Sequence, residues 1–278
     1  MSGFEDGLTV RFDEPLARHT AYRTGGPCAA FVVAHSEAAV STVLSECKAV
    51  KWRVHVLGSG SRVVVREGGL DGVVLRLGAA FATCRFVAPD LLEVGGALPV
   101  AAALAFAAEH GLAADYPLYT SPGSFGASVL LDDWDVVAGR VAQTRRIRDV
   151  EGGTLGPRFK GVVLQATVRL ERVGAPEAEA RLHRALRSEP VPVSSWVGTG
   201  GRAGSVRSVL RRASLERVRL RQVAIPVEAP ELMVNLGGGT ARDLQLLHKS
   251  AIERVQRVRG VKLASRMKWI GIKDGLGG

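Results

Sequence analysis

The sequence predicts an α+β protein that contains at least two sheet-forming units. Three short, β-branched runs follow one another at 54–57, 63–65 and 73–77, and glycine-rich turns separate them. Short apolar runs bounded by glycines are typical of buried strands. An Ala-rich segment at 98–110 has the composition of a helix, and Gly111 suits the position just after a helix end. The pattern of strands then restarts, which indicates a second unit.

The other elements are predicted in chain order. We expect residues 1–14 to be a polar lead-in, followed by an apolar strand after Gly25-Gly26-Pro27. Ser36 is a suitable N-cap for a helix over 36–49. The later predictions are strands at 91–94, 136–147 and 162–170, helices at 171–189 and 205–215, a loop or edge at 190–201, a strand at 232–236, a helix from Thr240 to about Val258, and a closing strand at 261–270.

Length and composition limit the class of protein. A chain of 278 residues with 46% hydrophobic residues can bury a large core in two or three subdomains. No apolar run approaches the roughly 20 residues that a membrane span needs, and residues 1–14 lack the features of a signal peptide, so we expect a cytoplasmic protein. Three scattered cysteines favour free thiols over disulfides, and we expect no metal site.

The formal net charge of +10 has two interpretations. A basic region at 202–221 would suit nucleic acid, but its arginines do not share one helix face, and we do not expect nucleic acid as a partner. An anionic or polar small molecule, such as a nucleotide or diphosphate, explains local basic charge equally well.

The run Gly58-Ser59-Gly60-Ser61 lies between two predicted strands. Glycine permits positive φ and close backbone approach, and successive backbone N–H groups in such a loop form a concave anion site. An ordinary tight turn is the alternative.

Five stretches, taken in order, give the chain a family resemblance. They are HTAYRTGGP at 19–27, VLGSGSRVVVREGGLDGVVLRL at 56–77, SPGSFGAS at 121–128, GVVLQATVRL at 161–170 and MVNLGGGTARDL at 233–244. The chain resembles the UDP-N-acetylenolpyruvoylglucosamine reductase family, also called UDP-N-acetylmuramate dehydrogenase. The resemblance implies the FAD-binding fold of the vanillyl-alcohol-oxidase type. It implies FAD-binding subdomains at 1–80 and 81–175 and a substrate-type α+β domain at 176–278, whose last strand can return to the first subdomain.

The resemblance also assigns the FAD contacts. Gly58, Ser59, Gly60 and Ser61 would bind the pyrophosphate, and Arg62 stands where the family usually has Asn. The second loop would contact the phosphate and ribityl side of FAD through Pro122, Gly123, Ser124, Gly126 and Ala127, the last replacing a usual Gly. Arg23, with Gly25 and Gly26, would buttress the first loop. Family members take hydride from NADPH, which remains possible here.

The family's catalytic residues are not retained in the same way. The Gly-Ser-x-Phe-Lys-Asn-Pro run that carries the family's proton-donating Ser is absent. We expect Ser205 to be a helix residue, so Ser194 and Ser195 remain as candidates for the proton donor. The remaining catalytic candidates are Arg158 in a shifted register, Arg266 at the position of the family's Glu, and Asp133 where an Asn-Ala-Gly run is usual.

Two further segments of the substrate-type domain depart from the family. The family's Ala-Gly-x-Leu-Ile helix start aligns with residues 203–207, so Arg207 stands at the position of the Ile. The family's Ser-Glu-Lys-His-Ala-Asn run is replaced by residues 226–231, so Glu231 stands at the position of the Asn. Losing a proton donor and a charge stabiliser costs several powers of ten in rate, so we expect no useful activity on the family's substrate. We expect a repurposed FAD enzyme of specialised metabolism. The alternatives are a non-catalytic FAD-binding protein and a genuine NADPH-dependent reductase with displaced catalytic groups.

Overall fold

The chain folds into two compact units that alternate along the sequence. The computed structural model describes residues 4–5, 7–114, 123–130, 141–147, 161–187, 196–199, 206–265 and 267–272. Unit 1 comprises residues 1–14, 28–60 and 71–188, and unit 2 comprises residues 15–27, 61–70 and 189–278. The domain boundaries at 80 and 175 stay a prediction.

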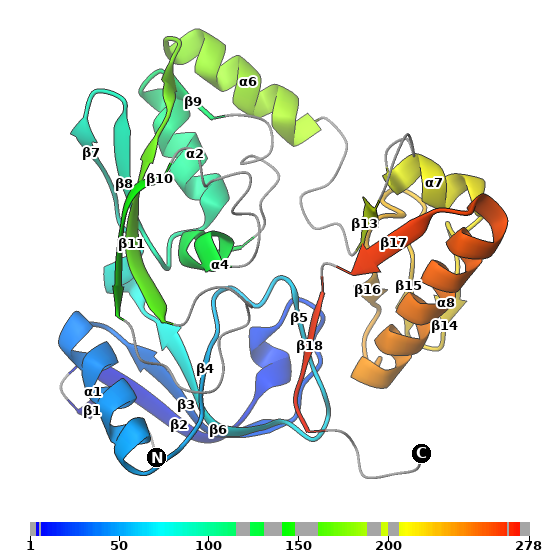
Figure 1. Cartoon of the computed structure of the whole chain (residues 1–278), viewed down its shortest axis with the longest axis horizontal. Helices are drawn as coiled ribbons and strands as arrows, with labels where there is room; N and C mark the ends of the chain where they lie inside the picture. Colours follow the sequence, from blue (N-terminus) through cyan, green and yellow to red (C-terminus); the bar gives the residue numbers. More distant parts are fainter. Residues whose placement is uncertain are drawn as a thin grey trace. The chain divides into compact units, whose positions relative to one another are not determined.

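The first sheet of unit 1 has five strands. Their order is β1 (Phe4–Glu5), β2 (Leu8–Pro15), β3 (Pro27–Ala34), β6 (Leu70–Leu77) and β4 (Val54–Val56). Helix α1 (Glu37–Ala49) lies along this sheet (Figure 1) and buries Val40 and Leu44 in a core shared with β6. Ser36 begins the helix as predicted, because its hydroxyl accepts a hydrogen bond from the N–H of Ala39 at 3.1 Å.

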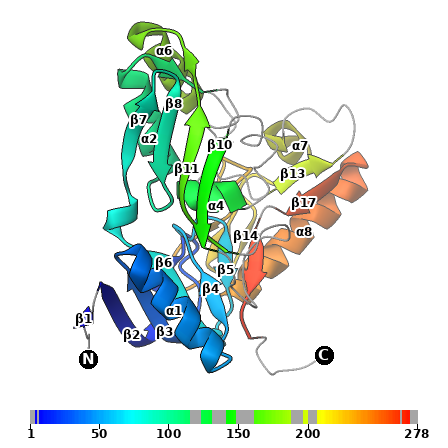
Figure 2. The same ribbon diagram turned by 60° about the vertical axis from the view of Figure 1, so that its left-hand side comes forward.

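The second sheet of unit 1 is antiparallel. Figure 2 shows its strands side by side in the order β10 (Val141–Ile147), β11 (Val162–Arg169), β8 (Leu91–Gly95) and β7 (Cys84–Ala88). The short 3₁₀ turn η2 (Ala79–Phe81) comes just before β7 in the sequence. Helices α2 (Val100–Glu109) and α4 (Phe125–Leu130) pack on this sheet through Leu104 and Phe125. Helix α6 (Ala175–Arg187) covers α2, and β9 (Leu112–Ala113) pairs with β12 (Glu171–Arg172).

Unit 2 gathers three separate parts of the sequence around one core. Its elements are η1 (Leu16–His19), β5 (Val63–Val65), β13 (Trp196–Thr199), α7 (Val206–Arg212), β14 (Arg219–Leu220), β15 (Val223–Ala224), β16 (Val234–Asn235), α8 (Ala241–Arg259), β17 (Lys262–Ser265) and β18 (Lys268–Ile270). Tyr22 and Val64 pack with Leu210, Leu244 and Leu247 in a single hydrophobic cluster. Strand β18 pairs in parallel with β5, so the end of the chain completes a strand pair begun near residue 63.

Helix α8 begins at a complete capping box. The Thr240 hydroxyl accepts from the N–H of Asp243 at 3.0 Å, and the Asp243 carboxylate accepts from the N–H of Thr240 at 3.2 Å. The Glu67 carboxylate, from the β5–β6 turn, accepts from the N–H of Ala241. Negative side chains at this end also suit the helix dipole, so Thr240 starts the helix as the sequence predicts.

Asn235 connects the start of α8 to the segment around residue 22. Its Nδ2 donates to the carbonyl oxygens of Tyr22 at 2.9 Å and Gly239 at 2.8 Å, and its Oδ1 accepts from the N–H groups of Gly237 and Gly239. A neutral amide thereby has both donors and its acceptor engaged, which fixes two sequence-distant loops of unit 2 together.

The structure differs from the predicted elements in several places. Residues 171–172, predicted as the start of a helix, form strand β12 because they pair with β9. Residues 8–15 form strand β2 and are no lead-in, because Leu8 and Val10 pack against the core of the first sheet. Strand β7 was not predicted. The closing strand is two strands, because β17 pairs with β13 whereas β18 pairs with β5. In the part of the chain that the structure describes, no helix is long and apolar enough to cross a membrane.

Candidate functional site

The first glycine loop, Gly58–Ser61, follows β4 at the edge of the five-stranded sheet. The N–H of Leu57 donates to the carbonyl oxygen of Leu75 at 2.9 Å, which holds the start of the loop on β6. Gly60 has φ +69°, a conformation that side chains with a Cβ rarely adopt. The loop is therefore a turn whose backbone favours glycine at position 60. Ser59 is exposed in it.

The described part of the second loop, residues 123–128, is held against the start of α2. Gly123 has φ +101°, and its carbonyl oxygen accepts from the N–H of Val100 at 3.0 Å. The N–H of Phe125 donates to Leu98, and that of Gly126 donates to Gly96 at 2.9 Å. Gly126 thus allows close packing of α4 on the sheet. Its N–H is engaged in the hydrogen bond to Gly96 and is not free to bind a phosphate. Pro122 lies outside the described residues.

The two loops contact each other within unit 1. A Cβ on Gly58 would lie 2.4 Å from the Ser124 hydroxyl oxygen and 3.0 Å from the Cβ of Ala127. Contacts that short do not occur, so only glycine fits at position 58 with this loop arrangement. The structure therefore brings Gly58 together with Ser124 and Ala127, three of the residues that the resemblance assigns to one cofactor.

Ser124 carries a hydroxyl that needs a partner. Its side chain is 4% exposed, and its Oγ has no hydrogen-bond partner among the described residues. Leaving a buried hydroxyl unpaired costs about 1–3 kcal/mol. A phosphate oxygen at this position would accept from the hydroxyl, and the missing Cβ of Gly58 leaves room for close approach of the backbone. The residues present thus fit an FAD phosphate.

Arg23, Gly25 and Gly26 lie in unit 2, against the strand that follows the first loop. A Cβ on Gly25 would lie 2.8 Å from the Val65 side chain, and one on Gly26 would lie 1.9 Å from the Glu67 carbonyl oxygen. The N–H of Gly26 donates to the carbonyl oxygen of Arg66 at 3.0 Å. This segment is therefore packed directly on β5 and its turn, and Arg23, with φ +52°, adopts the left-handed conformation there.

Arg62 and Ser61 also belong to unit 2. Arg62 is 6% exposed, and its carbonyl oxygen accepts from the N–H of Lys268 at 2.8 Å. The residue that replaces the family's Asn is therefore a buried part of the β5–β18 junction. Its contact with a diphosphate stays a prediction.

The candidate catalytic residues Arg158, Asp133 and Arg266 lie outside the described residues, as do Ser194, Ser195 and Ser205. Their roles stay predictions. Three buried or half-buried groups of unit 1 have shifted pKa values. Burial raises the pKa of the Cys28 and Cys84 thiols to about 11, so both are protonated at neutral pH. Burial also lowers the pKa of His55, whose Nε2–H donates to the carbonyl oxygen of Asp71 at 2.9 Å.

A buried ion pair occupies the part of unit 2 where the sequence departs from the family. The Arg207 guanidinium makes two hydrogen bonds to the Glu231 carboxylate, one of them at 2.9 Å. Arg207 is 5% exposed and Glu231 is fully buried. Sequence reasoning noted both positions separately but missed their pairing. The available signal was two charged residues placed where an apolar residue and an amide are usual.

Among the described residues no cluster of His, Cys, Asp and Glu could hold a metal ion. The candidate cofactor site is thus defined by the glycines of two loops and one buried hydroxyl, all in unit 1.

Comparison with known proteins gives the family. Residues 27–132 match a model described as an FAD binding domain. The chain is 30% identical to the UDP-N-acetylenolpyruvoylglucosamine reductase of Rubrobacter xylanophilus, over 94% of this chain and 95% of the relative. It is 28% identical to reductase 2 of Symbiobacterium thermophilum, over 93% and 91%.

A solved structure supports the fold. The UDP-N-acetylenolpyruvylglucosamine reductase of Thermus caldophilus superposes with a TM-score of 0.72 at 18% identity, covering 94% of this chain and 98% of that one. The predicted α+β, FAD-binding fold of the vanillyl-alcohol-oxidase type is confirmed, and so is FAD as the cofactor. With 30% identity over nearly the whole of both sequences, the chain belongs to the UDP-N-acetylenolpyruvoylglucosamine reductase family.

Proposed function

We propose that this chain is an FAD-dependent oxidoreductase that acts on a polar or anionic small molecule other than UDP-N-acetylenolpyruvoylglucosamine. The proposal rests on a contrast that the family resemblance implies between a retained cofactor side and an altered substrate side. Gly58, Ser124 and Ala127 form a compact cradle in unit 1. Unit 2 instead carries charged residues at positions where the family has an apolar residue and an amide.

The Arg207–Glu231 pair supports a substantial change in unit 2. Taking two charges out of water costs several kcal/mol per ion unless both are present and well paired. A single stray substitution at either position would leave an uncompensated buried charge. The two substitutions are therefore compatible with folding only when both are present. Random substitution of surface residues would not produce such a matched buried pair.

The residues have distinct roles in this proposal. Bound FAD supplies the capacity to accept and donate hydride. Ser124 donates a hydrogen bond to a phosphate oxygen, and Gly58 lets the two loops close on it. Arg158, Arg266 and Asp133 are the candidates for holding a substrate anion or moving a proton, and an arginine at position 266 attracts an anion where the family's glutamate would repel one.

The family's own reaction is the second candidate. It is favoured by identity of 30% over 94% of the chain to a relative that carries the reductase name. In that case the displaced catalytic groups lie among the residues outside the described part, and NADPH is the expected reductant. A non-catalytic FAD-binding protein is the third.

The test uses the full chain loaded with FAD. The protein is reduced with NADPH, NADH or dithionite without oxygen, then mixed with UDP-N-acetylenolpyruvoylglucosamine while flavin reoxidation and product mass are followed. We expect a flavin spectrum and no repeated turnover of this compound. Turnover at a rate comparable to that of a reductase from the family would overturn the proposal in favour of the second candidate.

A panel of anionic acceptors separates the first and third candidates. Reoxidation of the reduced flavin by an acceptor that also leaves a reduced product supports an enzyme. A protein that binds FAD but whose reduced flavin reacts with oxygen alone, across unsaturated acids and nucleotide-linked sugars, supports the third candidate.

A further inference from the structure

A pocket of about 360 Å³ opens at the turn that joins β7 and β8 in unit 1. Its lining comes from three elements of that unit and consists of Phe86, Val87, Ala88, Pro89, His110 and Arg172. This volume lies in the range of about 300–1,000 Å³ that is usual for small-molecule sites.

The pocket is separate from the FAD cradle. The N–H of Val100 contacts Gly123 at the start of α2, whereas His110 follows the last residue of the same helix. A helix of this length extends for about 15 Å. The second FAD loop and the pocket therefore lie at opposite ends of α2, and they also lie at opposite ends of β8.

One wall of the pocket is aromatic. The rings of Phe86 and Phe106 stack with centroids 5.4 Å apart, and the His110 ring lies 5.0 Å from Phe86 and 4.6 Å from Phe106. A β-bulge between Phe86 and Ala88 interrupts the β7–β8 register, and Val87 joins the lining there. Bulges commonly redirect side chains beside functional sites. Planar groups stack well on such a wall.

The opposite wall carries a guanidinium that lacks a carboxylate partner among the described residues. Arg172 Nη2 donates to the carbonyl oxygen of Pro89 at 2.9 Å, which holds the side chain over the turn. The acids next to Pro89 and Arg172 in the sequence are already paired: Asp90 lies 3.3 Å from Arg169, and Glu171 lies 2.7 Å from Arg181. The remaining N–H groups of Arg172 are thus available to an anion.

His110 adds a second polar group with a defined orientation. Its Nδ1–H donates to the carbonyl oxygen of Phe106 at 2.8 Å, so its Nε2 faces away from the helix backbone. An imidazole in this orientation can accept from, or when protonated donate to, a ligand beside Phe86. The pocket thereby combines an aromatic wall, one cation and one hydrogen-bonding ring nitrogen.

We propose that this pocket binds a small planar carboxylate, whose flat body stacks on Phe86 and His110 and whose carboxylate pairs with Arg172. The chemistry selects this class in two steps. The uncompensated guanidinium favours an anion, and carboxylates are its common partners. The ring wall favours a flat, apolar body over a branched one. The site does not depend on what the FAD centre reduces.

The experiment titrates cinnamate into the full, FAD-loaded protein by calorimetry while the flavin spectrum is recorded. We expect saturable binding with an unchanged flavin spectrum. Arg172→Met should weaken binding about tenfold or more, the usual cost of a lost hydrogen bond to a charged group. Cinnamyl alcohol, which lacks the charge, and 3-cyclohexylpropanoate, which lacks the planar ring, should each bind more weakly than cinnamate.

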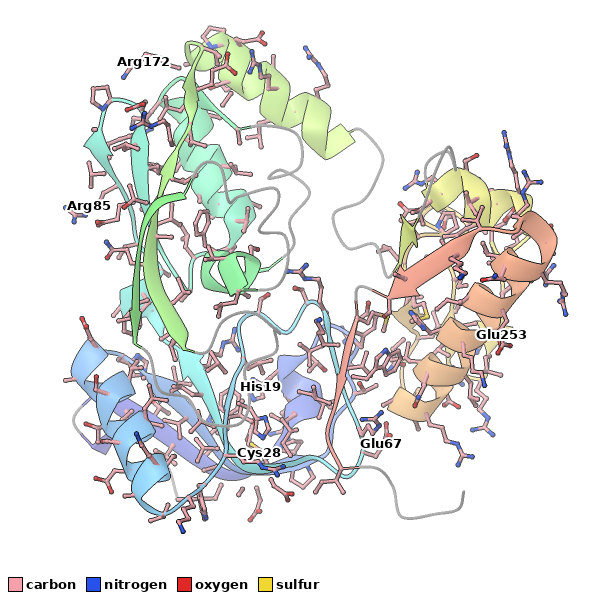
Figure 3. All side chains as sticks on the ribbon, in the orientation of Figure 1. His19, Cys28, Glu67, Arg85, Arg172 and Glu253 are labelled. Atoms are coloured by element: carbon pink, nitrogen blue, oxygen red, sulfur yellow. The ribbon has the colours of Figure 1, made fainter. Side chains whose placement is uncertain are left out.

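Arg85→Met is the matched control. Arg85 precedes Phe86 on β7, is exposed, pairs with Glu93 and does not line the pocket; Figure 3 shows it extending away from the sheet. It should leave cinnamate binding unchanged, and retained FAD shows that each variant is folded. The proposal is overturned if cinnamate gives no saturable binding, if Arg172→Met binds it as well as the unchanged protein, if Arg85→Met weakens it equally, or if cinnamate changes the flavin spectrum.

Discussion

The two units of the molecule differ in charge and in how they depart from the family. Unit 2 holds 20 of the 37 Lys and Arg residues but only 8 of the 27 Asp and Glu residues, whereas unit 1 holds the other 17 and 19. Unit 1 keeps the glycine loops of the cofactor cradle. Unit 2 contains the buried Arg207–Glu231 ion pair and carries the excess of positive charge.

This difference is what we expect if unit 1 holds the cofactor and unit 2 contributes to the proposed substrate site. A diphosphate is held largely by backbone geometry, and the close contact at position 58 and the positive φ at positions 60 and 123 favour glycine. A substrate surface is made by side chains, which can be replaced while the backbone persists. Excess positive charge in unit 2 suits an anionic ligand.

The largest expected effect is at Gly58. The change Gly58→Val places side-chain carbons where Ser124 and Ala127 already lie, so the two loops must separate and FAD binding should be lost. Flavin content after purification measures this. Gly174→Ala is the control, because nothing lies within 4 Å of its added Cβ; it strains a positive φ but should leave FAD content unchanged. A Gly58→Val protein with full flavin would contradict the cradle.

Next in size is the ion pair of unit 2. Arg207→Met leaves the Glu231 carboxylate buried without its partner and should reduce the free energy of unfolding by about 3–5 kcal/mol. The double change Arg207→Met with Glu231→Leu should recover most of that loss, because no charge is left uncompensated. Urea unfolding measures both. A double variant as unstable as the single one would show that the pair is not energetically coupled.

Ser124 allows a two-sided test of the cradle. Ser124→Ala should weaken FAD about tenfold, equivalent to about 1.4 kcal/mol, since it removes one hydrogen bond to a charged phosphate. The same change should leave the FAD-free protein as stable or more stable, because it removes a buried unpaired hydroxyl. FAD titration and thermal unfolding without FAD measure the two effects, with exposed Ser45→Ala as the control. A loss of stability without FAD, with unchanged FAD affinity, would contradict the assignment.

The smallest effect is at the α8 cap. Burial alone would raise the pKa of Asp243, but hydrogen bonds from Thr240 and the charge of Arg221 outweigh it and lower the pKa. Its contribution to stability is therefore full above the unfolded pKa and disappears as the pH falls through the lower, folded pKa. Asp243→Asn should cost about 1 kcal/mol at neutral pH and nothing in acid. Unfolding measured across pH tests this, and a constant difference would contradict it.

The local elements could be predicted from the sequence where one residue type dictates the backbone. Ser36 and Thr240 begin their helices because a hydroxyl must satisfy the first N–H groups, and Gly111 and Gly260 follow helices with φ of +76° and +65°. Strand β2 could not be recognised, because the charges of its second half mask the Leu8–Val10 alternation. Its strand character comes from pairing with β1 and from packing against the core.

The residues of the candidate site could be predicted from the sequence, but the contacts between them could not. The resemblance placed residues 58 and 124 on one cofactor, but only the fold brings the Gly58 backbone against the Ser124 hydroxyl. Likewise, no helical or strand period relates Arg207 to Glu231, which are 24 residues apart. Tertiary packing alone makes these pairs, so a sequence pattern cannot reveal them.

The parallel pair of β5 and β18 has a consequence for how the protein is made. Arg66, at the end of β5, hydrogen-bonds through its side chain to Gly271, 205 residues further along the chain. A ribosome has therefore produced the whole segment that matches an FAD binding domain long before β5 receives its neighbouring strand. Contacts this distant form late and slow the folding of a domain. The strand that leaves the first glycine loop therefore gains its neighbouring strand only after about 200 further residues have been added to the nascent chain.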